Sequence, residues 1–236
     1  MDFTGFTDFI DYKMDQEILL EQIVSYTIGA SEMIPNIANK AQQDYQLAIL
    51  PHGPHFYTGI LQSVGYLLLP QRKKLLLIIE QEQNNKEIYQ LTGKFGPILG
   101  QERTFREGDK QRKTEFQPSI QDLGTILQHL AYMQAISHQA EVRCLAVGKT
   151  LSIAKQKKLN EYLANIDSDT NVVFLTNVTV PTQTTNFPIT KLIKENAGSA
   201  VKTFHTMSQK LKRSSEIIAY AHGDKKGTKG YACIMA

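Results

Sequence analysis

The sequence is poor in the residues that build sulfur-based metal and redox sites. Its two cysteines, Cys144 and Cys233, lie far apart, and neither has a Cys-x-x-Cys partner or a neighbouring histidine. This spacing excludes the usual signatures of a structural zinc site or a dithiol redox centre. We therefore expect both cysteines to be free, buried thiols.

Long hydrophobic runs are also missing. No segment approaches the roughly 18 consecutive apolar residues that a membrane-spanning helix needs. Residues 1–16, MDFTGFTDFIDYKMDQ, carry aspartates where a secretory signal has a basic start, and they contain no continuous apolar region. These features predict a cytoplasmic protein with no membrane partner.

Charge of one sign is scarce too. The chain has 26 basic and 23 acidic residues, for a formal net charge of +3. Because both signs are interspersed, there is no basic stripe suited to tracking phosphates, and we expect no nucleic-acid partner. Lysines near the C-terminus leave open a basic interaction surface, which salt-dependent binding to an anionic partner would reveal.

Two signatures of catalysis are absent. Ser119 has no Gly-x-Ser-x-Gly setting, so it is not a credible hydrolase nucleophile. The segment TGKFGPILG, residues 92–100, lacks the Gly-Lys-Ser/Thr ending of a phosphate loop, and we interpret it as turns. The polar residues 101–114 that follow are expected to form a solvated surface loop.

The sequence does contain a pattern of alternating strands and helices, with enough apolar residues for one hydrophobic core. We therefore predict a single domain over residues 1–236, with a divergent helical segment at 1–44. Unbroken apolar runs predict buried strands at 45–50, 74–80, 141–147 and 171–176. Helical periodicity or length predicts helices at 15–28, 57–69, 119–133, 152–166 and 190–212.

The chain ends in two apolar runs, EIIAYA and YACIMA, on either side of a glycine- and lysine-containing turn. This pattern predicts an antiparallel hairpin. Together with the alternating elements, it predicts a three-layer α/β/α sandwich with a mostly parallel mixed sheet. Ligands in such sheets lie beyond the carboxyl ends of the strands, where the segment that begins with Pro51 and His52 would lie.

Three segments, in order, resemble the Memo family, known in prokaryotes as AmmeMemoRadiSam system protein B. PHGPHFYTG at 51–59 is similar to its P-H-A-G-Y-x-Y-S-G segment, keeping Pro51, His52, Tyr57, Thr58 and Gly59 or close substitutes. SIQDLGTILQHL at 119–130 is similar to its H-S-x-E-V-Q-L-P-F-L-Q helix. AYAHGDKKGTKGYACIMA at 219–236 resembles its closing Y-x-T-S-G-D, turn, V-G-Y-A segment.

The resemblance implies an α/β/α fold related to the protocatechuate-type extradiol dioxygenases, with a metal-binding pocket at the strand ends. It places His52 at the first ligand position. Glu80 or Glu82 falls at the next histidine position. Val178 and Pro181 fall at the acid and the histidine of an S-D-x-S-H loop, and Ala197 falls at a thiol position. The resemblance also implies that TNVTVP at 176–181 and NAG at 196–198 lie near His52. It suggests a radical-SAM protein or an AMMECR-type protein as a partner.

Loss of these ligands favours a non-catalytic, divergent Memo-like protein with no expected cofactor and a binding pocket for a small molecule or a partner. The pocket would comprise His52, His55, Tyr57, Glu82, Val178 and Ala197. The alternative is a metal-dependent, dioxygenase-like oxidoreductase that binds iron, copper or zinc through His52, His55 and Glu82. Two imidazoles and a carboxylate are the ligand types of a facial triad. Metal content separates the two.

Overall fold

The structure is a computed structural model of the chain. The described residues are 21–32, 44–52, 55–81, 86, 88–91, 94–98, 101–104, 129, 132, 140–180, 189–195, 198–222 and 230–236.

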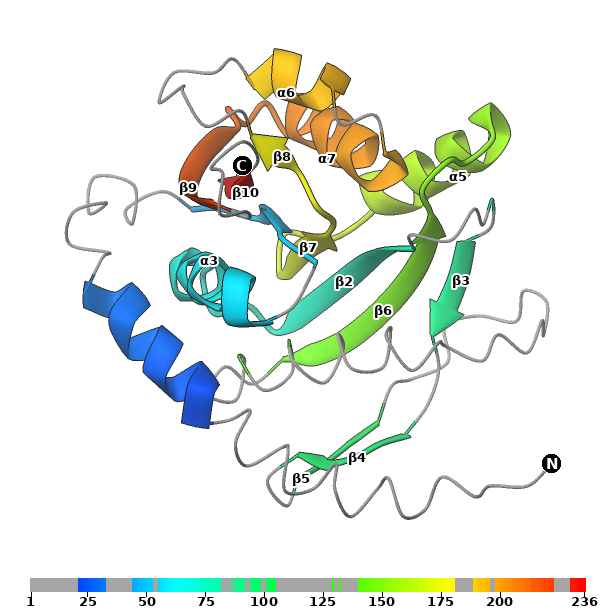
Figure 1. The fold of residues 1–236 in the computed structure, drawn as a ribbon. Coiled ribbons are helices and arrows are strands. Elements are labelled where there is room, and N and C mark those ends of the chain that lie inside the picture. The colour runs from blue at the N-terminus through cyan, green and yellow to red at the C-terminus, as the bar shows by residue number, and fades with distance from the viewer. Residues whose placement is uncertain are drawn as a thin grey trace, which may run out of the picture.

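In this part of the chain, eight strands form one mixed sheet in the order β3-β6-β2-β7-β1-β10-β8, and β9 pairs with β10 beside this path (Figure 1). The strands are β1 (Leu47–Leu50), β2 (Lys74–Gln81), β3 (Ile88–Leu91), β6 (Glu141–Gly148), β7 (Thr170–Leu175), β8 (Thr179–Val180), β9 (Glu216–His222) and β10 (Gly230–Met235). A separate antiparallel pair comprises β4 (Lys94–Ile98) and β5 (Gln101–Thr104).

The four predicted central strands are confirmed, and they are parallel to one another. β2 pairs in parallel with both β6 and β7, and β7 pairs in parallel with β1. β10 runs antiparallel to β1 and to β9, which confirms the C-terminal hairpin. Strands β2, β7 and β1 are almost entirely buried, because a parallel sheet covered on both faces has apolar side chains on both.

Successive residues of each strand enter two different cores, one on each face of the sheet. In β2, Leu75, Leu77 and Ile79 belong to the first core, and Leu76 and Ile78 belong to the second. Helix α3 (His55–Leu68) and the helical residues 21–32 cover the first face. Helices α5 (Ile153–Ala164), α6 (Ile189–Glu195) and α7 (Ser199–Lys210) cover the second (Figure 1). The three-layer α/β/α sandwich is thus as predicted.

A glycine lets α3 approach the sheet closely. A Cβ atom added to Gly65 would lie 2.2 Å from Cδ2 of Leu50, well inside van der Waals contact. Leu50 is fully buried at the end of β1. The close approach of α3 therefore fixes the end of β1, the strand that leads directly to His52.

Two predictions about local structure are wrong. The segment 190–212 is not one helix, because α6 ends at Glu195 and α7 begins at Ser199. The interpretation of TGKFGPILG as turns fails as well, because Lys94–Ile98 forms β4, and β5 takes up Gln101–Thr104 of the expected loop. Short strands with several polar residues carry too little periodicity to be identified from sequence.

Other expectations fall partly outside the described residues. Residues 21–32 are helical, but the first part of the predicted helix at 15–28 is not described, and of 119–133 only His129 and Tyr132 are described, both helical. Cys144 and Cys233 are free and buried, as predicted, and burial raises the pKa of both thiols. Among the described helices, none is long and apolar enough to span a membrane.

Candidate functional site

The carboxyl ends of three parallel strands meet at one edge of the sheet, which we call the carboxyl edge. Leu175 at the end of β7 pairs with Leu50 of β1 on one side and with Ile79 of β2 on the other. The backbone amide of Thr176 donates a 3.1 Å hydrogen bond to the carbonyl of Leu50. The residues that follow these strands are therefore brought side by side.

His52 lies at this edge and is only 9% exposed. Its backbone amide donates a 2.9 Å hydrogen bond to Oδ1 of Asn177. The carbonyl of Pro51 accepts a 2.8 Å hydrogen bond from the Gln62 side chain on α3. These two contacts give hydrogen-bond partners to the Pro51 carbonyl and the His52 amide, which follow the end of β1.

Of the segment 176–181 that the resemblance places near His52, the structure shows a direct contact for Asn177. Asn177 contacts the His52 backbone directly, and Val178 is fully buried in the core under α6 and α7. An apolar side chain thus occupies the position that the resemblance gives to an acid.

Glu80 is the buried acid of the carboxyl edge. It follows Leu76 and Ile78 on the same face of β2, so its side chain points toward the α7 layer. It is 6% exposed, and its carboxylate accepts a 2.9 Å hydrogen bond from the amide of Ala200 and a 3.1 Å bond from the Thr176 hydroxyl. A single carboxylate therefore joins β2, β7 and the first turn of α7.

Gly198 provides the space that this carboxylate occupies. A Cβ atom at Gly198 would lie 2.3 Å from one carboxylate oxygen of Glu80 and 2.5 Å from the other. Gly198 is the N-cap of α7 and makes no side-chain capping bond. Glu80 supplies the missing acceptor from a different element, and a negative charge is favoured there by the helix dipole.

Burial raises the pKa of the Glu80 carboxyl above its ordinary 4.5. The hydrogen bonds from Ala200 and Thr176, followed by the positive charges of Lys149 and Lys202, oppose this shift. Burial is the larger effect, since removing a carboxylate from water disfavours its charged form.

The remaining expected pocket residues are only partly described. His55 and Tyr57 lie in the first turn of α3, but their side chains are outside the described residues. Glu82, Pro181 and Ala197 lie outside as well. Among the described side chains, no group of three His, Cys, Asp or Glu residues could hold a metal ion.

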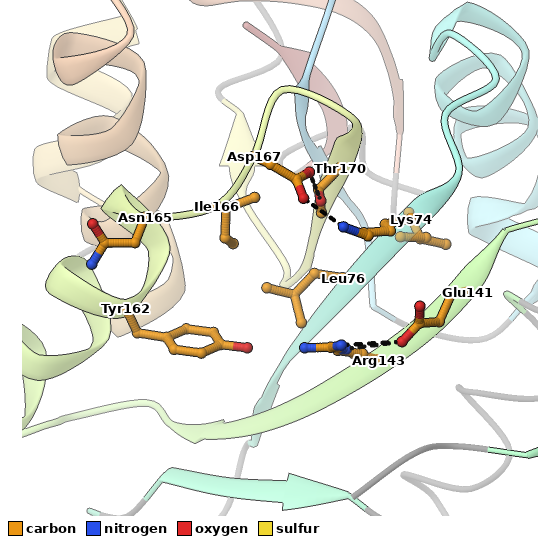
Figure 2. Close-up of a pocket in the computed structure, with 10 residues that line it drawn as sticks. Lys74, Leu76, Glu141, Arg143, Tyr162, Asn165, Ile166, Asp167 and Thr170 are labelled. Carbon is orange, nitrogen blue, oxygen red and sulfur yellow. Dashed lines mark hydrogen bonds and ion pairs between the residues drawn. The ribbon is translucent and has the colours of Figure 1, made fainter. Parts of the chain in front are cut away.

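A cavity lies at the opposite, amino edge of the sheet, away from His52. It has a volume of about 260 Å³ and lies between the starts of β2, β6 and β7 and the end of α5 (Figure 2). No sequence motif marks this cavity. The available signal was the alternation of Glu141 and Arg143 with Val142 and Cys144, which shows that β6 begins with one polar face.

Charged pairs line this amino-edge cavity. Nζ of Lys74 lies 2.6 Å from Oδ2 of Asp167, and Arg143 donates to Oε1 of Glu141 at 3.1 and 3.3 Å. Figure 2 shows the Tyr162 hydroxyl pointing toward the Arg143 guanidinium. The hydrogen bond to Glu141 raises the pKa of Arg143 most, so this side chain stays charged.

The fold therefore defines a protein of the three-layer α/β/α class, in which Glu80 is buried at the carboxyl edge. No protein-family model matches the sequence, and no curated protein matches it. Among solved structures, the chain is similar to the crystal structure of the uncharacterized protein JW3007 from Escherichia coli K12. The identity is 12%, the match covers 80% of this chain and 98% of that chain, and the TM-score is 0.47. Function has to be inferred from this chain's own residues.

Proposed function

We propose that this chain is a divergent, non-catalytic Memo-like protein that binds a small molecule or a partner at the carboxyl edge, around His52. The observation that carries this proposal is the position of Glu80. Its carboxylate, at one of the positions that the resemblance relates to a metal ligand, joins α7 to the sheet through Ala200 and Thr176.

A metal site needs several donors that converge on one open point. Glu80 instead directs its oxygens at the α7 backbone and at Thr176, and Gly198 packs against them. Val178 offers no donor atom. These features support a carboxyl edge whose polar groups hold the fold together rather than a catalytic ion.

The binding role is supported by the place of His52 in the sheet. Ligands of α/β sheets lie beyond the carboxyl ends of the strands, and His52 follows directly after β1. An imidazole ring has both a donor and an acceptor nitrogen, so it can orient a neutral polar group or a partner backbone.

Elemental analysis tests the non-catalytic half of the proposal. Protein prepared without chelator or affinity tag should contain no stoichiometric iron, copper or zinc and should cleave no catechol. The test variant is His52→Ala and the matched control is His205→Ala. His205 lies on α7, and its imidazole contacts Gln209 at the protein surface. Near-unit metal that disappears only in His52→Ala would overturn the proposal and favour ligation by His52, His55 and Glu82.

Ligand-observed NMR with a fragment library tests the binding half. Fragments that bind the wild-type protein should lose affinity in His52→Ala and keep it in His205→Ala. Fragments that bind all three proteins equally would place the binding site elsewhere and contradict the role of His52.

A further inference from the structure

The amino-edge cavity is built from one face of the sheet. Lys74 and Leu76 of β2 and Glu141 and Arg143 of β6 are on the same face, because Leu76 belongs to the second core together with Leu145 of β6. The parallel register places Lys74 beside Glu141 and Leu76 beside Arg143. These four side chains form a continuous floor beneath the end of α5.

The charged side chains that line the cavity are within reach of a ligand. The side chains of Lys74 and Arg143 are 43% and 45% exposed, and those of Glu141 and Asp167 are 38% and 50% exposed. They contribute two positive and two negative charges. A ligand with a single charge would therefore meet like charge as well as opposite charge, whereas a ligand with both charges can match both signs.

The end of α5 indicates which side of the cavity suits each charge of a ligand. Asn165 is the C-cap of α5 and lines the cavity. The carbonyl end of a helix carries partial negative charge and favours cations. Asp167 follows two residues later, so the α5 side of the cavity suits an ammonium group, and Arg143, with its planar fork of donors, suits a carboxylate.

Apart from Thr170, the rest of the lining is mainly apolar, and the space is small. Leu76, Ile166 and the ring of Tyr162 form the apolar walls, as Figure 2 shows. The volume of about 260 Å³ is below the range of roughly 300–1,000 Å³ that is typical of pockets for drug-sized ligands. The ligand must be correspondingly small.

We propose that the amino-edge cavity binds a small zwitterion, an amino acid with an apolar side chain, whose carboxylate contacts Arg143 and whose ammonium contacts Asp167. The apolar side chain lies against Leu76 and Ile166. This site shares no residue with the carboxyl edge, so its failure in a test would leave the proposed role of His52 untouched.

Calorimetric titration of the full chain with three matched probes tests this site. L-leucine carries both charges, isopentylamine carries only the ammonium and 4-methylpentanoate carries only the carboxylate, on the same apolar body. L-leucine should bind saturably at millimolar concentrations or below. Each single-charge probe should bind about tenfold more weakly, the loss that one charge-assisted contact is expected to cause.

Two variants assign the contacts, and an exposed lysine of α5 provides the control. Arg143→Gln should bind L-leucine about as weakly as the wild-type protein binds isopentylamine, and Asp167→Asn about as weakly as it binds 4-methylpentanoate. Lys158→Gln should bind like the wild-type protein. Thermal unfolding of each variant shows whether it is folded.

The proposal is overturned if L-leucine does not bind, if a single-charge probe binds as tightly as L-leucine, or if folded Arg143→Gln and Asp167→Asn proteins bind L-leucine like the wild-type protein. Loss of L-leucine binding in the Lys158→Gln control would also overturn it, because Lys158 does not line the cavity.

Discussion

The two edges of the central sheet contain acidic side chains in opposite environments. At the carboxyl edge, Glu80 is buried and accepts hydrogen bonds from Ala200 and Thr176. At the amino edge, Glu141 and Asp167 are substantially exposed and pair with Arg143 and Lys74. A carboxylate of the first kind holds elements of the fold together, whereas one of the second kind remains available to a ligand.

This difference follows from the position of the helices. α7 begins directly above the end of β2, so a side chain on that face is enclosed. α5 ends above the starts of β2 and β6 and leaves the cavity beside Arg143 open. We infer that the Glu80 carboxylate contributes more to the stability of the fold than the carboxylates of the amino edge do.

Replacing the buried acid should have the largest effect. Glu80→Ala leaves the Ala200 amide and the Thr176 hydroxyl without their acceptor inside the protein, and it should lower the free energy of unfolding by ~2–4 kcal/mol. The matched change at the amino edge, Glu141→Ala, should cost less than about 0.5 kcal/mol. Urea denaturation at neutral pH measures both, and equal costs would remove the distinction between the edges.

Filling the space beside Glu80 should have the next largest effect. Gly198→Ala places a methyl group against a carboxylate that cannot withdraw without losing its hydrogen bonds, and it should cost roughly 1–3 kcal/mol. The backbone angles of Gly198, φ −64° and ψ 156°, suit alanine, so the cost would not come from backbone strain. An unchanged urea midpoint in Gly198→Ala would contradict the close packing.

The two edges should respond to pH with opposite sign. Burial raises the pKa of Glu80 above 4.5, so the proton-linked part of its contribution to stability is fully present below pH 4.5 and is lost as the pH rises through the folded-state pKa. The hydrogen bonds that Glu80 accepts from Ala200 and Thr176 account for the cost of Glu80→Ala at neutral pH. Hydrogen bonds from Lys74 and Thr170 lower the pKa of Asp167 below 3.8. Its contribution is present above pH 3.8 and is lost as the pH falls through the folded-state pKa.

Differences in the free energy of unfolding between the wild-type protein and Glu80→Gln or Asp167→Asn measure these two contributions. From acid to neutral pH, the difference between the wild-type protein and Glu80→Gln should fall, and the difference between the wild-type protein and Asp167→Asn should rise. Parallel curves would show that the two carboxyl groups share one environment.

The smallest effect is expected for the exposed ion pair between Lys74 and Asp167. Lys74→Gln should lower the unfolding temperature only slightly at low ionic strength, and added salt should make this effect smaller still. Thermal unfolding at two salt concentrations measures it. A large, salt-independent cost would mean that the amino edge is as structural as the carboxyl edge.

The sheet could be predicted from the sequence because its central strands are unbroken apolar runs, whose burial on both faces depends little on neighbouring segments. The break between α6 and α7 could not be predicted. The residues NAG at 196–198 do not forbid a helix, and the break becomes understandable only when Glu80 is seen beside Gly198.

The candidate site was predictable only in part. The resemblance places residues 176–181 near His52, and the structure shows one such contact, the hydrogen bond from the His52 amide to Asn177. The orientation of Glu80 could have been predicted from the sequence, because the two-residue period of β2 places it on the same face as Leu76 and Ile78. The amino-edge cavity had no motif, because its lining comes from four segments that only the register of the sheet and the end of α5 bring together.

A double-mutant cycle between Glu80→Ala and Gly198→Ala, measured by urea denaturation in a buffer with chelator, tests the central claim most directly. If the Glu80 carboxylate packs against α7 as a part of the fold, Gly198→Ala should cost roughly 1–3 kcal/mol in the wild-type protein. Once Glu80 has become alanine, the cost should be clearly smaller, with only the preference of the N-cap for glycine over alanine remaining. The same cost in both backgrounds would contradict a structural role for Glu80 against α7.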